Sequence, residues 1–80
     1  MIELTVRYFA SLRDAAGIES ETWQTHAHGL RALYEELAAR HGFVWTPAHL
    51  RVAVDGDFAG WDDAPRAGSE VAFIPPVSGG

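Results

Sequence analysis

The sequence contains no cysteine and no lysine among its 80 residues. Without cysteine, the chain can form no disulfide, no thiolate nucleophile and no cysteine-based metal site. The 6 basic residues are all arginines, so the N-terminus is the only amine that could capture an activated carboxyl group. Met1 is the only sulfur-containing residue, so the chain cannot itself supply sulfur to a reaction.

Long apolar runs and an excess of positive charge are also missing. No run approaches the ~20 residues that cross a membrane, and Glu3 places an acid where a secretory signal would be basic or apolar. We therefore expect a cytoplasmic protein that does not bind membranes. The formal net charge of −5 disfavours nucleic acid as a partner. Hydrophobic residues at 48% and charged residues at 21% are typical of one small soluble domain.

Hydrophobic spacing predicts a single α+β domain. Residues 2–9 alternate as a strand, residues 9–16 form a short helix that ends at Gly17, and residues 18–23 form a second strand. A long helix at residues 30–41 is followed by strands at 50–54, 57–59 and 70–74. Two early strands, one long helix and three late strands indicate a sheet with one covered face.

The predicted helix at residues 30–41 has one apolar face. Its spacing predicts that this face buries Leu30, Leu33, Tyr34, Leu37, Ala38 and His41. The residues predicted to face outward are Glu35, Glu36, Ala39 and Arg40. Gly42 suits the position just after the helix, whereas His28 and Gly29 offer no good side-chain cap at its start.

The late strands are predicted to place two apolar side chains on the uncovered face of the sheet. Asp55-Gly56 predicts a type I′ hairpin turn. In the closing strand, we assign Val71 and Phe73 to the helix-covered face, so Ile74 projects from the opposite face. Phe58, just past the turn, is expected to join Ile74 there. Exposed apolar residues beside a chain end are typical of an interface with a partner protein.

The sequence ends with Pro75-Pro76-Val77-Ser78-Gly79-Gly80. Paired prolines lack backbone N–H groups and favour an extended segment. Glycine lacks a Cβ, so Gly79 and Gly80 fit a channel too narrow for any other residue. We therefore expect a domain at residues 1–76 and a flexible tail at residues 77–80, with the terminal carboxyl as the reacting group.

Other candidate sites are better explained as ordinary structure. His26 and His28 could begin a metal site, but no third ligand stands out, and we expect two exposed loop residues and no metal. Asp62-Asp63 is interpreted as a solvated turn. Ser11 lacks the glycines of a nucleophile elbow. The tryptophans could anchor an interface or line the edge of the core; they are Trp23, Trp45 and Trp61.

Three segments resemble MoaD proteins, which have the β-grasp or ubiquitin-like fold. Residues 6–17 (VRYFASLRDAAG) are similar to the opening strand and short helix of that family, and residues 52–56 (VAVDG) to its hairpin. Residues 68–80 (GSEVAFIPPVSGG) are similar to its C-terminal segment and are the most specific of the three. The sequence departs from the family pattern at Pro65, Arg66 and Ser69. The fold expected from this resemblance is a mixed sheet of about five strands packed on one main helix.

The resemblance implies a sulfur carrier for molybdopterin synthesis. In MoaD proteins an E1-like enzyme of the MoeB type uses ATP and Mg²⁺ to adenylate the terminal glycine, here Gly80, which then becomes a thiocarboxylate. The carrier docks on a MoaE-type large subunit, in a heterotetramer, and donates its sulfur to cyclic pyranopterin monophosphate. The carrier binds no cofactor and has no side-chain active site. With Ile74 and Phe58, the residues expected to contact the partner are Gly79, Ser78, Val77, Pro76 and Pro75.

Adenylation explains how an inert carboxylate could react. A carboxylate repels nucleophiles and has no good leaving group, whereas an acyl adenylate can expel AMP when sulfur attacks its carbonyl. The resulting thioacid is ionised and strongly nucleophilic at neutral pH. Two alternatives share the same tail: a ubiquitin-like modifier that joins Gly80 to target lysines, and a sulfur carrier for thiamine thiazole synthesis.

Overall fold

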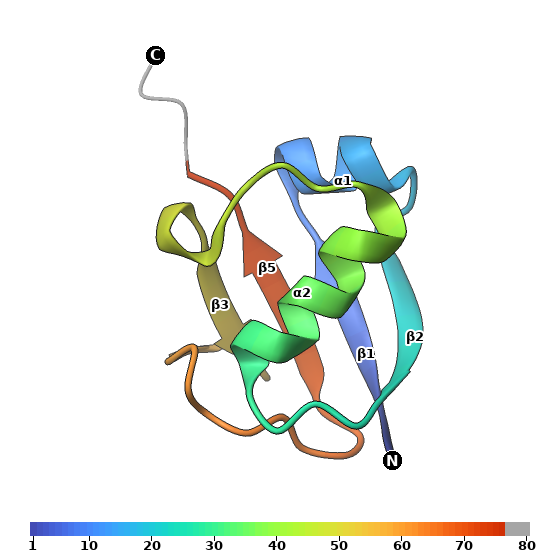
Figure 1. The fold of residues 1–80 in the computed structure, drawn as a ribbon, viewed down its shortest axis with the longest axis vertical. Helices are drawn as coiled ribbons and strands as arrows, with labels where there is room; N and C mark the ends of the chain where they lie inside the picture. The colour runs from blue at the N-terminus through green and yellow to red at the C-terminus, as the bar shows by residue number, and fades with distance from the viewer. Residues whose placement is uncertain (77–80) are drawn as a thin grey trace.

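The protein is a five-stranded mixed sheet crossed on one face by a long helix (Figure 1). This computed structural model describes residues 1–76, and Val77–Gly80 lie outside the described residues. The strand order is β2-β1-β5-β3-β4. The elements along the chain are β1 (Ile2–Tyr8), α1 (Ala10–Ala16), β2 (Ser20–Thr25), α2 (Leu30–His41), the 3₁₀ helix η1 (Pro47–His49), β3 (Arg51–Val54), β4 (Asp57–Ala59) and β5 (Glu70–Ile74).

The two central strands run in the same direction. β1 and β5 pair in parallel, with Tyr8 opposite Phe73, while the pairs β1–β2, β3–β4 and β3–β5 are antiparallel. The chain therefore enters the sheet at one end and leaves it, at the end of β5, at the other (Figure 1). This is the predicted α+β architecture with a single helix-covered face.

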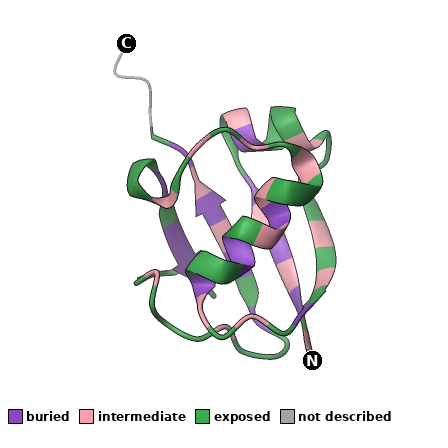
Figure 2. Cartoon of the chain, in the orientation of Figure 1, coloured by how far each residue is buried: buried purple, intermediate pink, exposed green. Residues whose placement is uncertain are grey.

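The core lies between α2 and the sheet (Figure 2). Leu4, Val6 and Tyr8 of β1 are buried, which confirms the predicted alternation of this strand. Val71 and Phe73 of β5 are fully buried, as expected for the helix-covered face. α2 contributes Leu30, Leu33, Tyr34 and Leu37.

The start of α2 is capped by a distant loop. Gly29 occupies the cap position and no side chain bonds the first turn, as its sequence predicted. Instead, the N–H groups of Leu30 and Arg31 donate to the carbonyl oxygens of Asp63 and Trp61 at 2.9 and 3.0 Å. These bonds satisfy two of the four donors that a helix start leaves free. At the other end Gly42, at φ 75°, donates to the Ala38 carbonyl.

The hairpin turn has the predicted conformation. Asp55 and Gly56 both have positive φ, at 50° and 90°, as a type I′ turn requires. The Asp55 side chain also accepts a hydrogen bond from the Glu70 N–H at 2.9 Å. The turn between β3 and β4 is therefore tied to the start of β5.

Two predictions need correction. The second strand occupies Ser20–Thr25 and not residues 18–23, because pairing with β1 places Thr25 opposite Ile2 and leaves Ile18 in the turn after α1. Glu36 does not face solvent: it is half-buried and accepts hydrogen bonds from Trp23 Nε1 at 3.0 Å and Thr25 Oγ1 at 2.8 Å. In both cases contacts with β2 override the local pattern.

Smaller boundary differences concern the ends of elements. β1 ends at Tyr8, and Phe9 is the residue before α1; β3 begins at Arg51 after a 3₁₀ turn that the sequence did not indicate. Within residues 1–76, no helix is long and apolar enough to span a membrane.

Candidate functional site at the root of the tail

The uncovered face of the sheet has an apolar half and a polar half. Strand register places five side chains in one row across all the strands, in the order Phe58, Ala53, Ala72, Arg7 and Ser20. The three apolar members lie on β4, β3 and β5, and the two polar members on β1 and β2. The surface that could bind a partner by apolar contact is therefore confined to the last three strands.

Ile74 extends this apolar half toward the end of the chain. It lies opposite Arg51 of β3, in the next row, and is half-buried on the uncovered face. Phe58 is 70% exposed. We refer to Ala53, Phe58, Ala72 and Ile74 as the apolar patch. The prediction that Ile74 and Phe58 lie on the face opposite to Val71 and Phe73 is confirmed.

A groove of about 770 Å³ lies beside the patch, at the point where the tail leaves the domain. It is lined by Pro47, Ala48, His49, Leu50, Arg51, Phe58, Trp61, Ile74, Pro75 and Pro76. Four of the residues predicted to contact a partner thus border one concave surface. Pro75 is buried and Pro76 is exposed, so the described chain turns from packed to solvent-facing between the two prolines.

One cationic side chain stands over the patch. The Arg51 guanidinium lies 5.8 Å from the centre of the Phe58 ring, a cation–π distance. Among residues 1–76, no carboxylate lies within ion-pair distance of Arg51, whereas Arg7 in the polar half lies 3.7 Å from Glu70. The groove therefore offers an apolar surface with one positive charge at its border, which suits a partner whose own rim is acidic.

The residues expected to react or to enter a partner lie beyond this surface. Val77, Ser78, Gly79 and Gly80 lie outside the described residues. The structure places the root of the tail, Pro75 and Pro76, next to Phe58 and Ile74 of the apolar patch. The roles of these four residues remain predictions.

The remaining side-chain candidates lie in ordinary structural positions. His26 and His28 are exposed, as predicted. Among residues 1–76, no group of three or more His, Cys, Asp or Glu side chains is placed to hold a metal ion. Asp63 accepts a hydrogen bond from the Gly60 N–H at 2.9 Å within a turn. Ser11 is half-buried in α1. All three tryptophans pack at the edge of the core, and Trp61 also borders the groove.

A polar cluster at the end of α2 was not predicted from the sequence. Glu21 Oε2 accepts a hydrogen bond from the Tyr8 hydroxyl at 2.5 Å and lies 2.6 Å from His41 Nε2. Burial raises the pKa of the Tyr8 phenol. The hydrogen bond from Tyr8 to Glu21 and the negative charge of the Glu21 carboxylate raise this pKa further. Burial also raises the pKa of Tyr34, whose hydroxyl donates to the Trp45 carbonyl at 2.6 Å.

The hydrogen bonds of this cluster connect β1, β2 and α2. Tyr8 is on β1, Glu21 on β2 and His41 at the end of α2. The ring of Phe43 stacks on His41 at 5.3 Å and meets Tyr8 edge-on at 5.5 Å. A corrected register for β2 could have revealed the contact, because Glu21, Trp23 and Thr25 then share the helix-covered face. We interpret the cluster as structural.

Comparison with known proteins identifies the family. The profile of the ThiS family matches residues 6–80. A curated relative, the molybdopterin synthase sulfur carrier subunit of Haemophilus influenzae, is 32% identical over 81 residues, covering 96% of this chain and 99% of the relative.

Solved structures agree with this family. SAMP1 of Haloferax volcanii has a TM-score of 0.81 at 26% identity, over 98% of this chain and 99% of that one. A putative molybdopterin converting factor, subunit 1, of Pyrococcus furiosus has a TM-score of 0.80 at 29% identity, over 96% of this chain and 100% of that one. The fold is thus the β-grasp that the sequence motifs indicated, and the chain belongs to the ThiS/MoaD family as a sulfur carrier of that type.

Proposed function

We propose that this chain is the sulfur-carrying small subunit of a molybdopterin synthase. One observation carries the proposal. Phe58 and Ile74 of the apolar patch line the same groove as Pro75 and Pro76, and the sequence continues from these prolines to Ser78-Gly79-Gly80. Two similar proteins support it, because both are named as subunits in molybdopterin chemistry.

In this mechanism the folded domain acts as a handle and Gly80 carries the reaction. An E1-like, MoeB-type enzyme transfers AMP from ATP to the Gly80 carboxylate and releases pyrophosphate, with Mg²⁺ bound to the nucleotide. A sulfur nucleophile then displaces AMP and leaves a thiocarboxylate, whose anion attacks the pterin substrate. Because the chain contains no cysteine, every sulfur atom that reaches the pterin comes from an external donor through Gly80.

The groove and the apolar patch indicate which surface of the domain the large subunit would cover. A MoaE-type partner that covers Phe58 and Ile74 would fix the tail root at the edge of the interface, so that residues 77–80 alone enter its active site. Glycine at the last two positions lets the backbone pass a narrow entrance. Docking and delivery thus depend on different residues, which allows each to be tested separately.

Reconstitution tests the proposal. The purified chain, thiocarboxylated chemically at Gly80, is combined with a MoaE-type subunit and cyclic pyranopterin monophosphate, and molybdopterin is assayed by fluorescence after oxidation. We expect product only with the thiocarboxylate, whereas the carboxylate form and a variant lacking Gly80 serve as controls. Product formation by the variant without Gly80 would remove the tail from the mechanism.

A protein modifier is the second candidate, supported by the likeness to SAMP1 of Haloferax volcanii, whose full name is small archaeal modifier protein 1. Mass spectrometry separates the two functions. A carrier shows exchange of one oxygen for sulfur on the free chain, whereas a modifier yields larger species in which Gly80 is joined to lysines of other proteins. The remaining alternative is a sulfur carrier for thiamine thiazole synthesis. Failure of a thiazole synthase to accept sulfur from the thiocarboxylated chain would exclude it.

A further inference from the structure

The groove at the root of the tail is lined without acidic residues. The chain has 11 acidic residues and a formal net charge of −5. Among residues 1–76, however, none of those that line the groove is Asp or Glu, and Arg51 is the lining residue that carries a permanent charge. The groove is therefore positive on a protein that is negative as a whole, and it attracts acidic groups that the rest of the surface repels.

The fold presents Arg51 at the border of the apolar patch. Leu50, the preceding residue, is buried in the core, and Arg51 begins β3 directly opposite Ile74 of β5. Arg51 is exposed, and its guanidinium lies 5.8 Å from the centre of the Phe58 ring. A guanidinium is weakly hydrated and its stem is apolar, so it is suited to an apolar interface better than an ammonium group is. A partner can therefore cover Arg51 together with the patch.

No acid of the described chain neutralises Arg51. Within residues 1–76, carboxylates lie at ion-pair distance from Arg7 and His41 but not from Arg51. An apolar partner surface that covered this guanidinium would remove its water without replacing the lost interactions, which costs free energy. A carboxylate on the partner would replace them with charge-assisted hydrogen bonds. The partner that fits the groove thus combines an apolar group with an acidic one.

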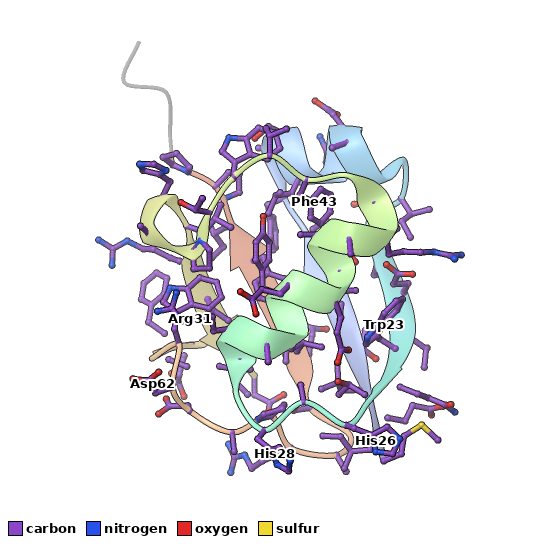
Figure 3. All side chains as sticks on the ribbon, viewed as in Figure 1. Trp23, His26, His28, Arg31, Phe43 and Asp62 are labelled. Carbon is purple, nitrogen blue, oxygen red and sulfur yellow. The ribbon has the colours of Figure 1, made fainter. Side chains whose placement is uncertain are left out.

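The sign of the charge changes across Phe58. Its ring also borders a smaller hollow of about 290 Å³ on the other side. That hollow is lined by Val54, Asp57, Phe58, Ala59, Asp63, Ala64 and Arg66. Two acids against one arginine make it negative, and Asp62 of the same loop lies near the start of α2, away from the root of the tail (Figure 3). A partner carboxylate is therefore attracted only on the Arg51 side of the ring, which favours one orientation of the partner.

We propose that Arg51 determines partner specificity at the groove: it selects a protein that places a carboxylate beside the apolar group seated against Phe58 and Ile74. This inference rests on the proposed function, in which that protein is the large subunit of the synthase. The carboxylate and the guanidinium form an ion pair at the border of the interface. A large subunit with a neutral or basic residue at that place binds this chain more weakly.

Arg7 provides a matched control on the same face of the sheet. Its guanidinium lies over the Phe9 ring at 5.3 Å, but it is also 3.7 Å from Glu70 and does not line the groove. From the strand register, the Cα atoms of Arg7 and Arg51 are roughly 12 Å apart. Arg7→Gln and Arg51→Gln each remove one positive charge and change the net charge from −5 to −6. Only Arg51→Gln removes the charge from the groove.

Surface plasmon resonance with an immobilised MoaE-type subunit measures Kd and the association rate of the full chain and its variants. The salt concentrations are about 20 mM and about 500 mM, where screening lengths are roughly 20 Å and 4 Å. We expect Arg51→Gln to raise Kd about 10-fold at low salt, with slower association, and less than about 2-fold at high salt. Arg7→Gln should change Kd by less than about 2-fold at both. Arg51→Lys keeps the charge and should retain the salt dependence of the original chain.

The outcomes separate this inference from the proposed function. Equal effects of Arg51→Gln and Arg7→Gln, or a Kd that does not depend on salt, would overturn the inference even if the complex makes molybdopterin. Binding that depends on Arg51 and on salt, without molybdopterin formation, would support the inference and count against the proposed function. Failure of the unmodified chain to bind would contradict both. Both arginines lie at the surface, so urea unfolding should give the original midpoint for both variants.

Discussion

Phe58 is the most exposed large apolar side chain in the strands of the sheet, at 70%. Its ring contributes little to the core, because it stands on the uncovered face over Ala53 and beneath the Arg51 guanidinium. Large apolar side chains in such a position commonly supply binding energy for a partner. At the scale of single residues, Phe58 is therefore the best place to separate binding from folding.

Replacing Phe58 with Asp should weaken binding of a MoaE-type partner by about 2 kcal/mol, or roughly 30-fold in Kd. The unfolding midpoint of the isolated domain should hardly change. Isothermal titration calorimetry measures the affinity. Val44→Asp is the matched control, because Val44 is 81% exposed but does not line the groove. Ile74→Asp should act in the same direction, and normal binding by both patch variants would show that the partner docks elsewhere.

Two tyrosines make stability sensitive to alkaline pH. Burial raises the pKa of both Tyr8 and Tyr34, with Glu21 adding to the effect at Tyr8, while the unfolded phenols ionise near pH 10. Above that pH the unfolded chain binds fewer protons than the folded chain. The stabilisation is therefore complete below about pH 10 and falls as pH rises, by up to about 1.4 kcal/mol per pH unit per tyrosine.

Urea unfolding between about pH 9 and 11 measures this loss. We expect the free energy of unfolding to fall over this range, and to fall less steeply in Tyr8→Phe, which keeps the ring but removes the ionisable hydroxyl. An unchanged slope in Tyr8→Phe would mean that the Tyr8 phenol has no part in the alkaline loss.

At the scale of elements, two carboxylates connect β2 to the rest of the fold. Glu36 of α2 accepts from Trp23 and Thr25, and Glu21 of β2 joins Tyr8 and His41. β2 is an edge strand whose outward residues are exposed. Together with the half-buried Trp23, which packs against the core, these hydrogen bonds fix which face of β2 is turned inward.

Glu36→Ala should destabilise the domain by about 1–3 kcal/mol, because it leaves the half-buried Trp23 and the buried Thr25 donors without an acceptor. Glu35→Ala is its neighbour on the same helix but is exposed, and its effect should stay within about 0.5 kcal/mol. Thermal or urea unfolding of the pair provides the comparison. If both variants have equal stability, the Glu36 bonds contribute nothing to holding β2.

At the scale of the whole molecule, we propose that the folded domain docks on the partner and that Gly79 and Gly80 deliver the sulfur. Among residues 1–76, the buried members of the hydrophobic core lie between Leu4 and Phe73.

Deleting Gly80, or replacing Gly79 with Trp, should abolish sulfur transfer and leave the free energy of unfolding within about 0.5 kcal/mol of the original. Circular dichroism and thermal melting measure the fold, and the molybdopterin assay measures transfer. Phe58→Asp is the complementary variant, with an intact tail and impaired docking. A large drop in melting temperature on deleting Gly80 would contradict this division of work.

The sequence alone determined the elements whose apolar periodicity or turn residues match the side that the fold buries. The alternation of β1 and the spacing of α2 predicted their buried faces, because one periodic apolar face can face only one core. Asp55-Gly56 predicted the hairpin, since few residue pairs tolerate two positive φ angles. The tail motif and the absence of lysine are likewise properties of the sequence itself.

Tertiary structure alone decided what depends on residues distant in sequence. The register of β2 followed from pairing with β1, because a polar edge strand with mixed alternation specifies its register weakly. Glu36 is turned inward because Trp23 and Thr25 supply hydrogen-bond donors. α2 begins without a capping side chain because the carbonyl groups of Trp61 and Asp63 accept hydrogen bonds from its first turn. The groove exists because η1, β4 and the end of β5 meet at the root of the tail; such a meeting depends on long-range packing, which no local pattern encodes.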